Sequence, residues 1–480
     1  MSNYTVPKEI RELKPKGTMV KLLHDKYYVY NYTSYKDDNG KWKTKMGSMI
    51  GRITLENGFI ANNSFNTDTD ISTLEYGQYS IVIKNSNSTF ERLSKHFNPI
   101  DALTIYYLCV IHVVNGFTPL KNVEKYVTQS YLSISNSNLK FSYYKLSQLI
   151  ESLGRQQSKV LEYEQDMIDN SSKELIIDGH VISSSSHEND LAEYGNKFNI
   201  LKDKQINYLL VYDLNTETPI ASRIYPGGML DKSSVQTQLD FNNYKNVLFI
   251  IDKGFYSKDN ITLFSSNNNH YIIPLSQNLK EYKDVTKELK LDNMFIYEKS
   301  NKKISVEYKE VTYTNKKIIV YKDVDQSLRD NQDYLKNMEK NPTKYTTERY
   351  NEVKEFFGVI VLETNLTITS EEIFKYYKKR WKIETFFNYF KNKADINSLG
   401  LNDYYITQGM SFIMLITGQI YEELKKVVKN IKGKNIDDCL LECRFAKLNK
   451  IDNSWKVSNA KKELRELLLK LNVDINNPLK

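Results

Sequence analysis

Cysteine and histidine are scarce in this sequence. Its 480 residues include three cysteines, Cys109, Cys439 and Cys443, and six histidines, and no cysteine is paired with a histidine at zinc-binding spacing. So few thiols argue against a disulfide framework and indicate a reducing compartment in which the cysteines are buried. A structural zinc site is therefore not expected.

Long apolar runs are absent as well. The longest apolar stretches, such as residues 106–114, fall far short of the roughly 18 residues that cross a bilayer. The first residues, MSNYTVPKEIRELKPKG, lack the apolar region of a signal peptide. We therefore expect a soluble protein that is neither exported nor bound to a membrane and that acts in the cytoplasm.

The chain carries a moderate excess of positive charge. It has 67 lysines and arginines against 59 aspartates and glutamates, a formal net charge of +8. This excess suits a polyanionic partner, because each neutralised phosphate releases counterions, although many basic proteins never bind nucleic acid. At the usual domain size of roughly 100 to 200 residues, a chain of this length is expected to form several units.

The pattern of the N-terminal part changes from strand to helix. Residues 26–49 hold an aromatic run, an Asn-Gly pair and a lysine-rich run, which predict a β-hairpin with a tight turn. Apolar residues then recur at steps of three and four, which predicts helices over 99–114, 119–132 and 142–153. These helices are compatible with a helix-turn-helix and equally with a packing unit that makes no DNA contact.

Two aspartates follow short apolar runs in the central part. Asp178 ends the run ELIID and Asp252 ends VLFIID, and further strands are predicted over 206–214, 219–225 and 270–275. Ligands bind at the carboxyl ends of strands in open mixed sheets, so the two aspartates face one site if their strands are neighbours. An aspartate near glycine is more often a turn former, so the pair needs independent support.

That support comes from residues 371–392, a segment without glycine or proline that has helical periodicity. As one continuous helix, it would place Tyr377, Arg380, Glu384 and Lys391 on one face about 60° wide. An apolar stripe lies beside this face and would anchor it to a core. The stripe consists of Ile383, Phe386, Phe387 and Phe390.

The charges of this segment are unusual. Between residues 375 and 393 there are seven bases and one acid, Glu384, whereas an ordinary solvated helix mixes both signs. A lone acid among bases suits a site that holds a metal and also grips phosphates. The plainer alternative is a surface helix in which Glu384 pairs with Arg380 or Lys391.

The spacing of Tyr377, Arg380, Glu384 and Lys391 matches a Tyr-x2-Arg-x3-Glu-x6-Lys signature at every position. Together with the blocks IIDGHVIS, YPGGMLD and FIIDKGFYS, this makes residues 174–420 resemble bacterial insertion-sequence transposases of the DDE class. The resemblance implies an α/β protein with a ribonuclease H-like mixed-sheet core. Its first carboxylate would lie on the first strand, its second would end the fourth strand, and the glutamate would lie on a following helix.

The patterns and the resemblance together predict four parts. They are an N-terminal β-hairpin plus helical DNA-binding region (1–165), a ribonuclease H-like catalytic core (166–275 and 355–430), a β-rich insertion (276–354) and a helical C-terminal region (431–480). By family analogy the insertion lies against the transposon end and helps to hold a flipped base on an aromatic side chain. No tryptophan occurs in it, so a tyrosine or phenylalanine would serve.

The resemblance also implies a chemistry. Asp178 would bridge two Mg²⁺ or Mn²⁺ ions per active site, and Asp252 and Glu384 would each complete one side, since hard oxygen ligands suit these ions. Water would free a 3′-hydroxyl at the element's end, which would then attack the opposite strand to form a hairpin and finally attack target DNA. The tyrosine, arginine and lysine of the signature would grip DNA phosphates.

Other candidate ligands are less suitable. His180 and His187 follow the first aspartate, but histidine suits zinc or iron better than magnesium, so we assign them no role. Asp231 and Glu188 are acidic neighbours that would serve only if the main assignment were wrong. The expected partners are double-stranded DNA, as terminal inverted repeats and as target, and a second copy of the chain, acting on the bacterial nucleoid. A helix over 460–473 would either mediate that homodimer or pack within the chain.

Two rival functions remain open. One is a catalytically inactive relative that binds terminal repeats without cutting them, and the presence of all three carboxylates disfavours it. The other is a different ribonuclease H-like nuclease, such as a junction resolvase or a nuclease acting on RNA–DNA hybrids. The long insertion and the Tyr-Arg-Glu-Lys face favour the transposase, because a plain nuclease needs neither. A hydrolase acting on something other than nucleic acid would have no use for the basic helix.

Overall fold

The chain forms two compact units, seen here in a computed structural model. The structure describes residues 6–37, 39–61, 73–136, 138–184, 186, 188–195, 204–229, 231–299, 302–392, 403–451, 454–458 and 460–479. The smaller unit comprises Met1–Ser72 with Lys450–Asn453, and the larger comprises Thr73–Asn449 with Ser454–Lys480. The predicted N-terminal region, 1–165, therefore spans both units.

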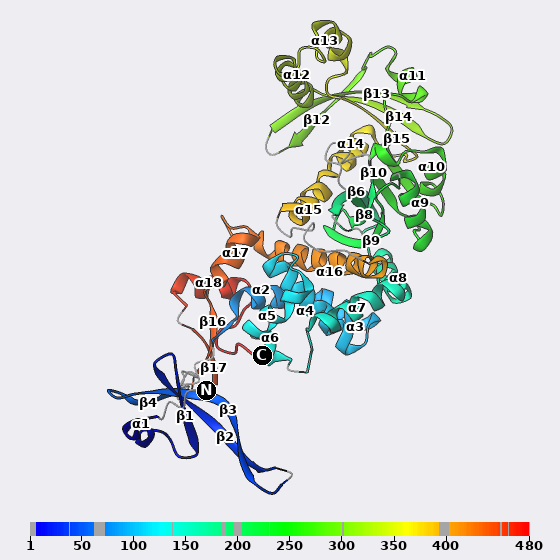
Figure 1. The fold of residues 1–480 in the computed structure, drawn as a ribbon. Helices are drawn as coiled ribbons and strands as arrows, with labels where there is room; N and C mark the ends of the chain where they lie inside the picture. Colours follow the sequence, from blue (N-terminus) through cyan, green and yellow to red (C-terminus); the bar gives the residue numbers. More distant parts are fainter. Residues whose placement is uncertain are drawn as a thin grey trace. The chain divides into compact units, whose positions relative to one another are not determined.

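The smaller unit is an antiparallel sheet with one short helix. The sheet runs in chain order through β1 (Thr18–Leu23), β2 (Lys26–Lys36), β3 (Trp42–Thr54) and β4 (Gly58–Ala61), after α1 (Lys8–Glu12) (Figure 1). The hairpin predicted over 26–49 is confirmed, because β2 and β3 pair from Tyr27 opposite Ile53 to Lys36 opposite Trp42. Its core is small and consists of Ile10, Val29 and Ile53.

The larger unit is built on a mixed sheet. Its central strands are β6 (Glu174–Ser184), β8 (Lys204–Asp213), β9 (Thr218–Pro226), β10 (Leu248–Ile251) and β11 (His270–Pro274), with the two-residue β7 (Glu193–Tyr194) at the edge. They lie side by side in the order β9, β8, β6, β10, β11. β6, β10 and β11 run parallel, and β8 and β9 run antiparallel to their neighbours. The predicted mixed α/β sheet is confirmed.

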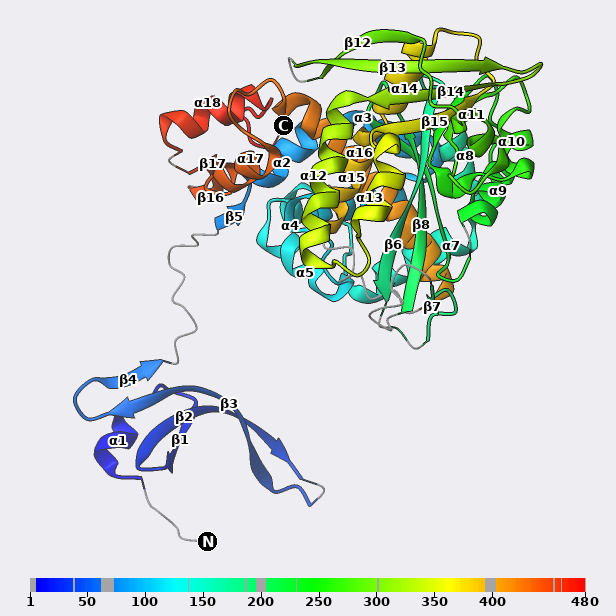
Figure 2. The same cartoon turned by 90° about the horizontal axis from the view of Figure 1, so that it is seen from above.

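The same sheet continues beyond β11. The additional strands follow in the order β15 (Val359–Thr364), β14 (Lys317–Asp323), β13 (Lys302–Thr312) and β12 (Asn293–Lys299), all antiparallel. The predicted insertion, 276–354, thus contributes three strands to the central sheet. It also supplies α11 (Lys280–Thr286), α12 (Val324–Lys340) and α13 (Thr347–Val353). Figure 2 shows α12 and α13 side by side, and the rings of Tyr334 and Tyr350 join them.

Helices cover both faces of the central strands. α9 (Asp231–Phe241) and α10 (Lys258–Phe264) lie on one side, and α15 (Trp381–Asn392) and α16 (Tyr404–Val428) lie on the other (Figure 1). This explains why β6 and β10 carry apolar residues at consecutive positions, since both faces of each strand are buried. Leu175, Ile176 and Ile177 of β6 and Phe249, Ile250 and Ile251 of β10 have no exposed surface.

The three segments predicted as helices before the sheet form α4 (Pro99–Asn115), α5 (Leu120–Gln129) and α7 (Tyr143–Arg155), with the short α6 (Leu132–Ser135) after α5 and α8 (Gln157–Asp169) after α7. α4 and α7 pack against α16, and α5 packs against α4 and α7. A Cβ added to Gly154 of α7 would lie 1.9 Å from the carbonyl oxygen of Tyr405, and one on Gly409 would lie 1.9 Å from that of Ile150. The backbones of α7 and α16 therefore touch. The four helices form a packing unit, and a DNA-binding role for them stays a prediction.

α4 is the most deeply buried of these helices. Its residues 104–113 are all buried. Among the helices of the described ranges, none is by itself long and apolar enough to cross a membrane. α4 and α5 reach that length and composition only when joined, and they are bent by 88°.

The C-terminal region, 431–480, is not wholly helical as predicted. Besides α17 (Ile436–Cys443) and α18 (Lys462–Lys470), it contains β16 (Lys447–Ile451) and β17 (Ser454–Val457). β16 pairs with β5 (Thr73–Glu75), which joins the two ends of the larger unit. The apolar face of the helix predicted over 460–473 is buried within the chain at Leu467, Leu468 and Leu471. This face therefore packs within the chain and is not free for a partner.

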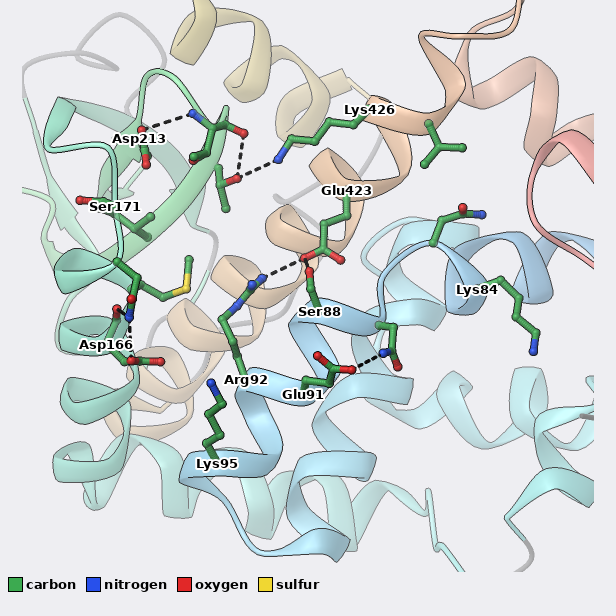
Figure 3. A pocket seen from close by; sticks show the side chains of 18 residues that line it. Lys84, Ser88, Glu91, Arg92, Lys95, Asp166, Ser171, Asp213, Glu423 and Lys426 are labelled. Atoms are coloured by element: carbon green, nitrogen blue, oxygen red, sulfur yellow. Dashed lines mark hydrogen bonds and ion pairs between the residues drawn. The ribbon is translucent and has the colours of Figure 1, made fainter.

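A cavity of about 790 Å³ lies between α3 (Asn87–His96), α8, α16 and the turn that joins β8 to β9. Its charged side chains are of both signs, and Arg92 binds Glu423 at 2.8 Å (Figure 3). None of the predicted catalytic carboxylates lines this cavity. The candidate site lies elsewhere in the same unit.

Candidate active site

The pairing of β6 with β10 brings the two aspartates together. Ile177 of β6 lies opposite Ile251 of β10 in the last pair of this parallel ladder, so Asp178 and Asp252 occupy the next position on each strand. The prediction that both aspartates end their strands is wrong for Asp178. β6 continues to Ser184, and Asp178 itself pairs with Leu210 of β8. Asp178 is exposed to the site because its other neighbour, β10, ends one residue earlier.

The segment 371–392 is not the continuous helix that its periodicity predicts. It forms two helices, α14 (Ser370–Lys378) and α15. Between them the backbone hydrogen bonds join residues three positions apart, as in a 3-10 turn. The N–H of Arg380 donates to the carbonyl oxygen of Tyr377 at 3.0 Å, and that of Lys382 to Lys379 at 3.1 Å. The predicted 60° face therefore does not extend across the break.

Tertiary packing explains the break, because the two helices are held by different surfaces. Phe374 of α14 contacts Phe295, Tyr297 and Tyr321 on the added strands of the sheet. Phe386 of α15 instead packs against Tyr212 of β8. Local helical propensity is weaker than these contacts. The break places Arg380 in the turn between the two helices.

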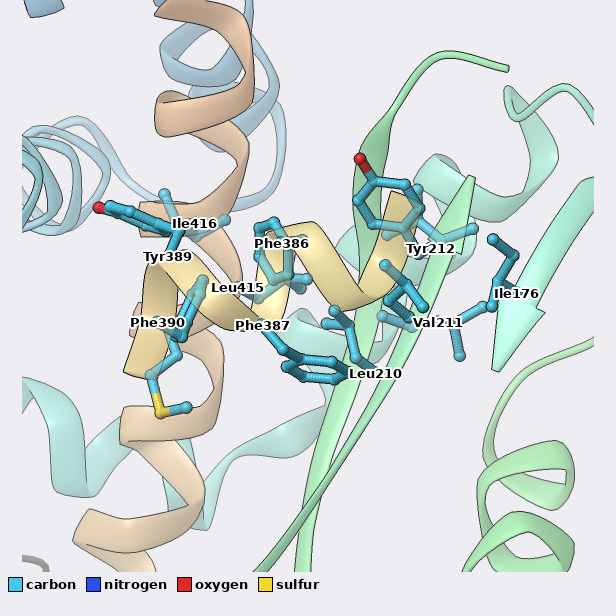
Figure 4. Packing of buried hydrophobic residues seen from close by; sticks show 14 of the residues in the cluster. Ile176, Leu210, Val211, Tyr212, Phe386, Phe387, Tyr389, Phe390, Leu415 and Ile416 are labelled. Carbon is cyan, nitrogen blue, oxygen red and sulfur yellow. The ribbon is translucent and has the colours of Figure 1, made fainter. Parts of the chain in front are cut away.

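The apolar stripe predicted on α15 is confirmed. Ile383, Phe386 and Phe390 have no exposed surface, and Phe387 is 7% exposed. Figure 4 shows these rings between α16 and the strands of the sheet. The ring of Phe387 stacks on His180 with centroids 5.1 Å apart, so this histidine has a packing contact. α15 is thereby fixed, and Glu384 in its first turn is held facing the sheet edge.

The guanidinium of Arg380 joins all three predicted carboxylates. Its Nη1 lies 3.2 Å from Oδ2 of Asp178, and its Nη2 lies 2.6 Å from Oε1 of Glu384 and 4.0 Å from Oδ1 of Asp252. The plainer alternative, a pair between Glu384 and Arg380, is therefore present, but within a larger cluster. Three acids from three elements, far apart in the sequence, converge on one cation.

Burial in this cluster differs among its members. The Asp178 and Arg380 side chains are 17% exposed, whereas Asp252 is 35% and Glu384 54% exposed. Burial raises the pKa of Asp178 to about 6, although Arg380 and the N–H of Gly179, at 2.8 Å, favour its charged form. Because burial disfavours the charged form of Asp178, an additional cation beside it would stabilise the ionised carboxylate.

The remaining signature residues differ in their distance from this cluster. Tyr377 is half-buried next to Asp252, and burial raises the pKa of its hydroxyl to about 12, so it is protonated at neutral pH. Lys391 is exposed on α15, seven residues after Glu384, which is about 10 Å along a helix. The structure therefore brings Tyr377 and Arg380 to the carboxylates, and Lys391 lies apart from them.

A second cavity, of about 430 Å³, opens beside Asp252 and Tyr377. Its floor includes buried Leu275 and Val361, and its rim carries exposed polar side chains. That rim includes Lys253, Gln277 and Asn278. The sequence motifs did not point to these residues. Their position could have done so, since they lie two to four residues after the carboxyl ends of the parallel strands β10 and β11, where ligands bind.

The less suitable ligands differ in their distance from the cluster. The carboxylate of Asp231, at the start of α9, lies beside the turn that follows Asp252, since a Cβ on Gly254 would be 3.0 Å from it. Glu188 is exposed in a loop, and His187 lies outside the described residues. In the part of the chain that the structure describes, no three acidic, histidine or cysteine side chains are close enough to hold one metal ion together. Asp178 faces Nη1 of Arg380, whereas Asp252 and Glu384 both face Nη2, so the three carboxylates surround one guanidinium.

Comparison with known proteins gives three findings. A solved structure entitled as the cryo-EM structure of a piggyBac transposase synaptic complex with hairpin DNA aligns over 82% of each chain, with 11% identity and a TM-score of 0.39. No curated protein sequence matches the chain. The family model for the transposase DDE domain matches residues 170–416. This match covers more than half of the chain and contains Asp178, Asp252 and Glu384. The chain belongs to the DDE transposase family.

Proposed function

We propose that the protein is a metal-dependent DNA transposase that cuts at the terminal inverted repeats of an insertion sequence and joins the freed 3′ ends to target DNA. One observation carries the proposal. Asp178, Asp252 and Glu384, from β6, the end of β10 and α15, converge on one guanidinium within the region that matches the family. Three converging acids on a basic segment suit a site for phosphate chemistry.

The order of the strands supports a ribonuclease H-like core. Leaving aside the two-residue β7, Asp178 lies on the first strand of the sheet, Asp252 follows the fourth, and Glu384 lies on a later helix. This is the arrangement that the family resemblance implies. We propose the domain roles accordingly, with 1–165 and the insertion 276–354 contacting DNA, and with 431–480 completing the fold.

The donor set fits divalent ions in kind. Three carboxylates supply hard oxygen ligands of the type that Mg²⁺ and Mn²⁺ prefer. Asp178 would be shared by two ions, and Asp252 and Glu384 would each hold one. When bound, the ions supply activation of the attacking oxygen and stabilisation of the leaving oxygen.

The protein's own groups orient the DNA. Tyr377, protonated at neutral pH, donates a hydrogen bond from its hydroxyl to a phosphate oxygen near Asp252. Arg380 offers a planar fork for phosphate oxygens, and exposed Lys391 adds a point charge farther along the strand. Water first frees a 3′-hydroxyl at the element's end, and this hydroxyl attacks the opposite strand to form a hairpin end. A second water then opens the hairpin and frees the 3′-hydroxyl again, which attacks target DNA.

The proposed partners follow from this reaction. Two ends of an element must be held together, so we propose a homodimer on double-stranded DNA. The apolar face of α18 is buried within the chain and is not proposed as the contact between copies. We propose that the complex acts in the cytoplasm on the bacterial nucleoid.

The test is strand cleavage of labelled linear DNA that carries the inverted repeats flanking the protein's own gene, with Mg²⁺ or Mn²⁺. Wild-type protein is expected to cut at the repeat ends, and Glu384→Gln is expected to bind the DNA without cutting it. A matched control is Glu371→Gln, which removes a solvent-accessible acid on the neighbouring helix α14 that pairs with Lys375 at 2.6 Å.

Each outcome bears on a different part of the proposal. Equal cleavage by wild type and Glu384→Gln would refute the assignment of Glu384. Binding without cleavage by the wild type would favour an inactive relative. Cleavage of branched DNA or of RNA–DNA hybrids in preference to repeat ends would favour another nuclease.

A further inference from the structure

Arg380 has two roles, as counterion of the carboxylates and as a proposed phosphate-binding residue, and the observed conformation serves only the first. As a phosphate-binding residue it needs free N–H groups, yet both of its terminal nitrogens face carboxylates. Nη1 is bonded to Asp178 at 3.2 Å and Nη2 to Glu384 at 2.6 Å. The side chain is only 17% exposed. In this conformation the fork of Arg380 is not directed at DNA.

The same nitrogens compete with a metal ion for the same oxygens. Mg²⁺ binds carboxylate oxygens at about 2.0 to 2.1 Å, so an ion on Oδ2 of Asp178 would stand against the guanidinium that lies 3.2 Å from that oxygen. Two cations on one oxygen repel each other strongly in a partly buried site. An ion on the carboxylate oxygens that face the guanidinium therefore favours displacement of Arg380.

The local backbone allows such a movement without moving the helices. Arg380 lies in the turn between α14 and α15, while Phe374 on one side and Phe386 on the other are fully buried. The helices are thus anchored, and the arginine between them is outside the regular helical hydrogen-bond pattern. Its long side chain can change rotamer while Glu384 keeps its place.

We infer that Arg380 couples metal binding to DNA binding, a role that we call an interlock. Without metal it is the counterion that holds the three carboxylates together. When divalent ions enter, its side chain leaves the carboxylates and binds a DNA phosphate. This inference rests on the proposed function and deepens it. DNA and metal then bind cooperatively, because a phosphate gives Arg380 a new partner and empties the carboxylates. The site is thereby protected from occupation by ions when no DNA is present.

The first test measures metal binding without DNA or cleavage. Isothermal titration with Mn²⁺ alone compares wild type, Arg380→Gln and the control Lys379→Gln, which removes the neighbouring exposed cation of the same turn. Arg380→Gln is expected to bind Mn²⁺ on the order of tenfold more tightly than wild type, within the usual range of coupling between sites. Lys379→Gln is expected to bind like wild type.

The second test measures the coupling itself. Duplex DNA carrying the inverted repeat is expected to tighten Mn²⁺ binding to wild type on the order of tenfold, and to leave that of Arg380→Gln unchanged, because coupling is reciprocal and passes through this side chain. If Arg380→Gln does not fold, Arg380→Lys replaces it, since one ammonium cannot bridge three carboxylates as the fork does. Melting curves with and without Mn²⁺ report folding, and the midpoint should rise more in the variant.

The outcomes separate the two proposals. Equal Mn²⁺ affinity of wild type and Arg380→Gln, with binding abolished by Asp178→Asn in both, would overturn the interlock and keep the metal site. Mn²⁺ binding that persists in Asp178→Asn would overturn the metal site of the proposed function, and the interlock with it. Tighter binding in Arg380→Gln that is lost on adding Asp178→Asn supports both.

Discussion

Arg223 and Arg380 both bind carboxylates in the larger unit, but their surroundings differ. Nη1 of Arg223 lies 2.7 Å from Oε1 of Glu164, and the two side chains are 7% and 0% exposed. The N–H of Ser222 donates to the same carboxylate at 3.1 Å. One cation and one anion are balanced in a closed core. Neither residue is accessible to a ligand.

The cluster around Arg380 is unbalanced and open. Three carboxylates share one guanidinium, so two negative charges are left over when all are ionised, and Glu384 is 54% exposed. A balanced buried pair has no partner to exchange, whereas an open acidic cluster accepts further cations. The difference teaches that the ratio of charges and their access to solvent distinguish a structural arginine from one at a reactive site.

The largest expected effect is on stability, when the same substitution, glutamate to glutamine, is made in each of the two clusters. Glu164→Gln leaves Arg223 as a buried charge without a counterion, which should lower the free energy of unfolding by about 3 to 5 kcal/mol. Glu384→Gln should change it by less than about 1 kcal/mol, because its carboxylate is exposed. Urea unfolding followed by circular dichroism measures both. Equal losses of stability in the two variants would contradict the distinction.

A second effect concerns pH and uses the burial of Asp178. In the folded protein its pKa is raised from the ordinary 3.8 to about 6, so the fold binds its proton more tightly than the unfolded chain does. Its contribution to stability is therefore full below about pH 4 and is lost as the pH rises through about 6. This loss should amount to about 3 kcal/mol.

The measurement compares wild type with Asp178→Asn in the presence of a chelator, since the amide does not titrate. The difference in free energy of unfolding between them should fall as the pH rises from about 4 to about 7. A difference that stays constant over this range would show that burial does not disfavour the anionic form of Asp178.

Local pattern predicted much of the fold correctly. The strands β8, β9 and β11, the N-terminal hairpin and the buried stripe of α15 follow from alternation and helical spacing, which depend on near neighbours. Sequence order did not predict that β12 to β15 would extend the central sheet, because strand pairing at this distance depends on the whole fold. The end of β6 was misjudged for the same reason, since it depends on pairing with β8.

The sequence predicted which residues would meet at the candidate site, but not how they are arranged. The signature and the two strand ends named the acids that the structure brings together, along with Tyr377 and Arg380. Periodicity alone favoured one straight helix, and it missed the turn at Lys379 that aims the arginine at Asp178. Packing of Phe374 and Phe386 on different surfaces causes that turn, and neither surface is visible in the spacing of residues.

The smallest expected effect extends the comparison to Lys391, a cation with no place in either cluster. It is exposed about 10 Å along α15 from Glu384, so the contact with DNA that we propose for it would act through solvent-screened charge and not through the carboxylates. Lys391→Ala should weaken DNA binding modestly and equally across sequences, and it should reduce the slope of log affinity against log salt by about 1. Fluorescence anisotropy at several salt concentrations measures this, with Lys375→Ala as the control, because Lys375 is held by Glu371. A loss of cleavage in Lys391→Ala at saturating DNA would instead place Lys391 within the reactive cluster.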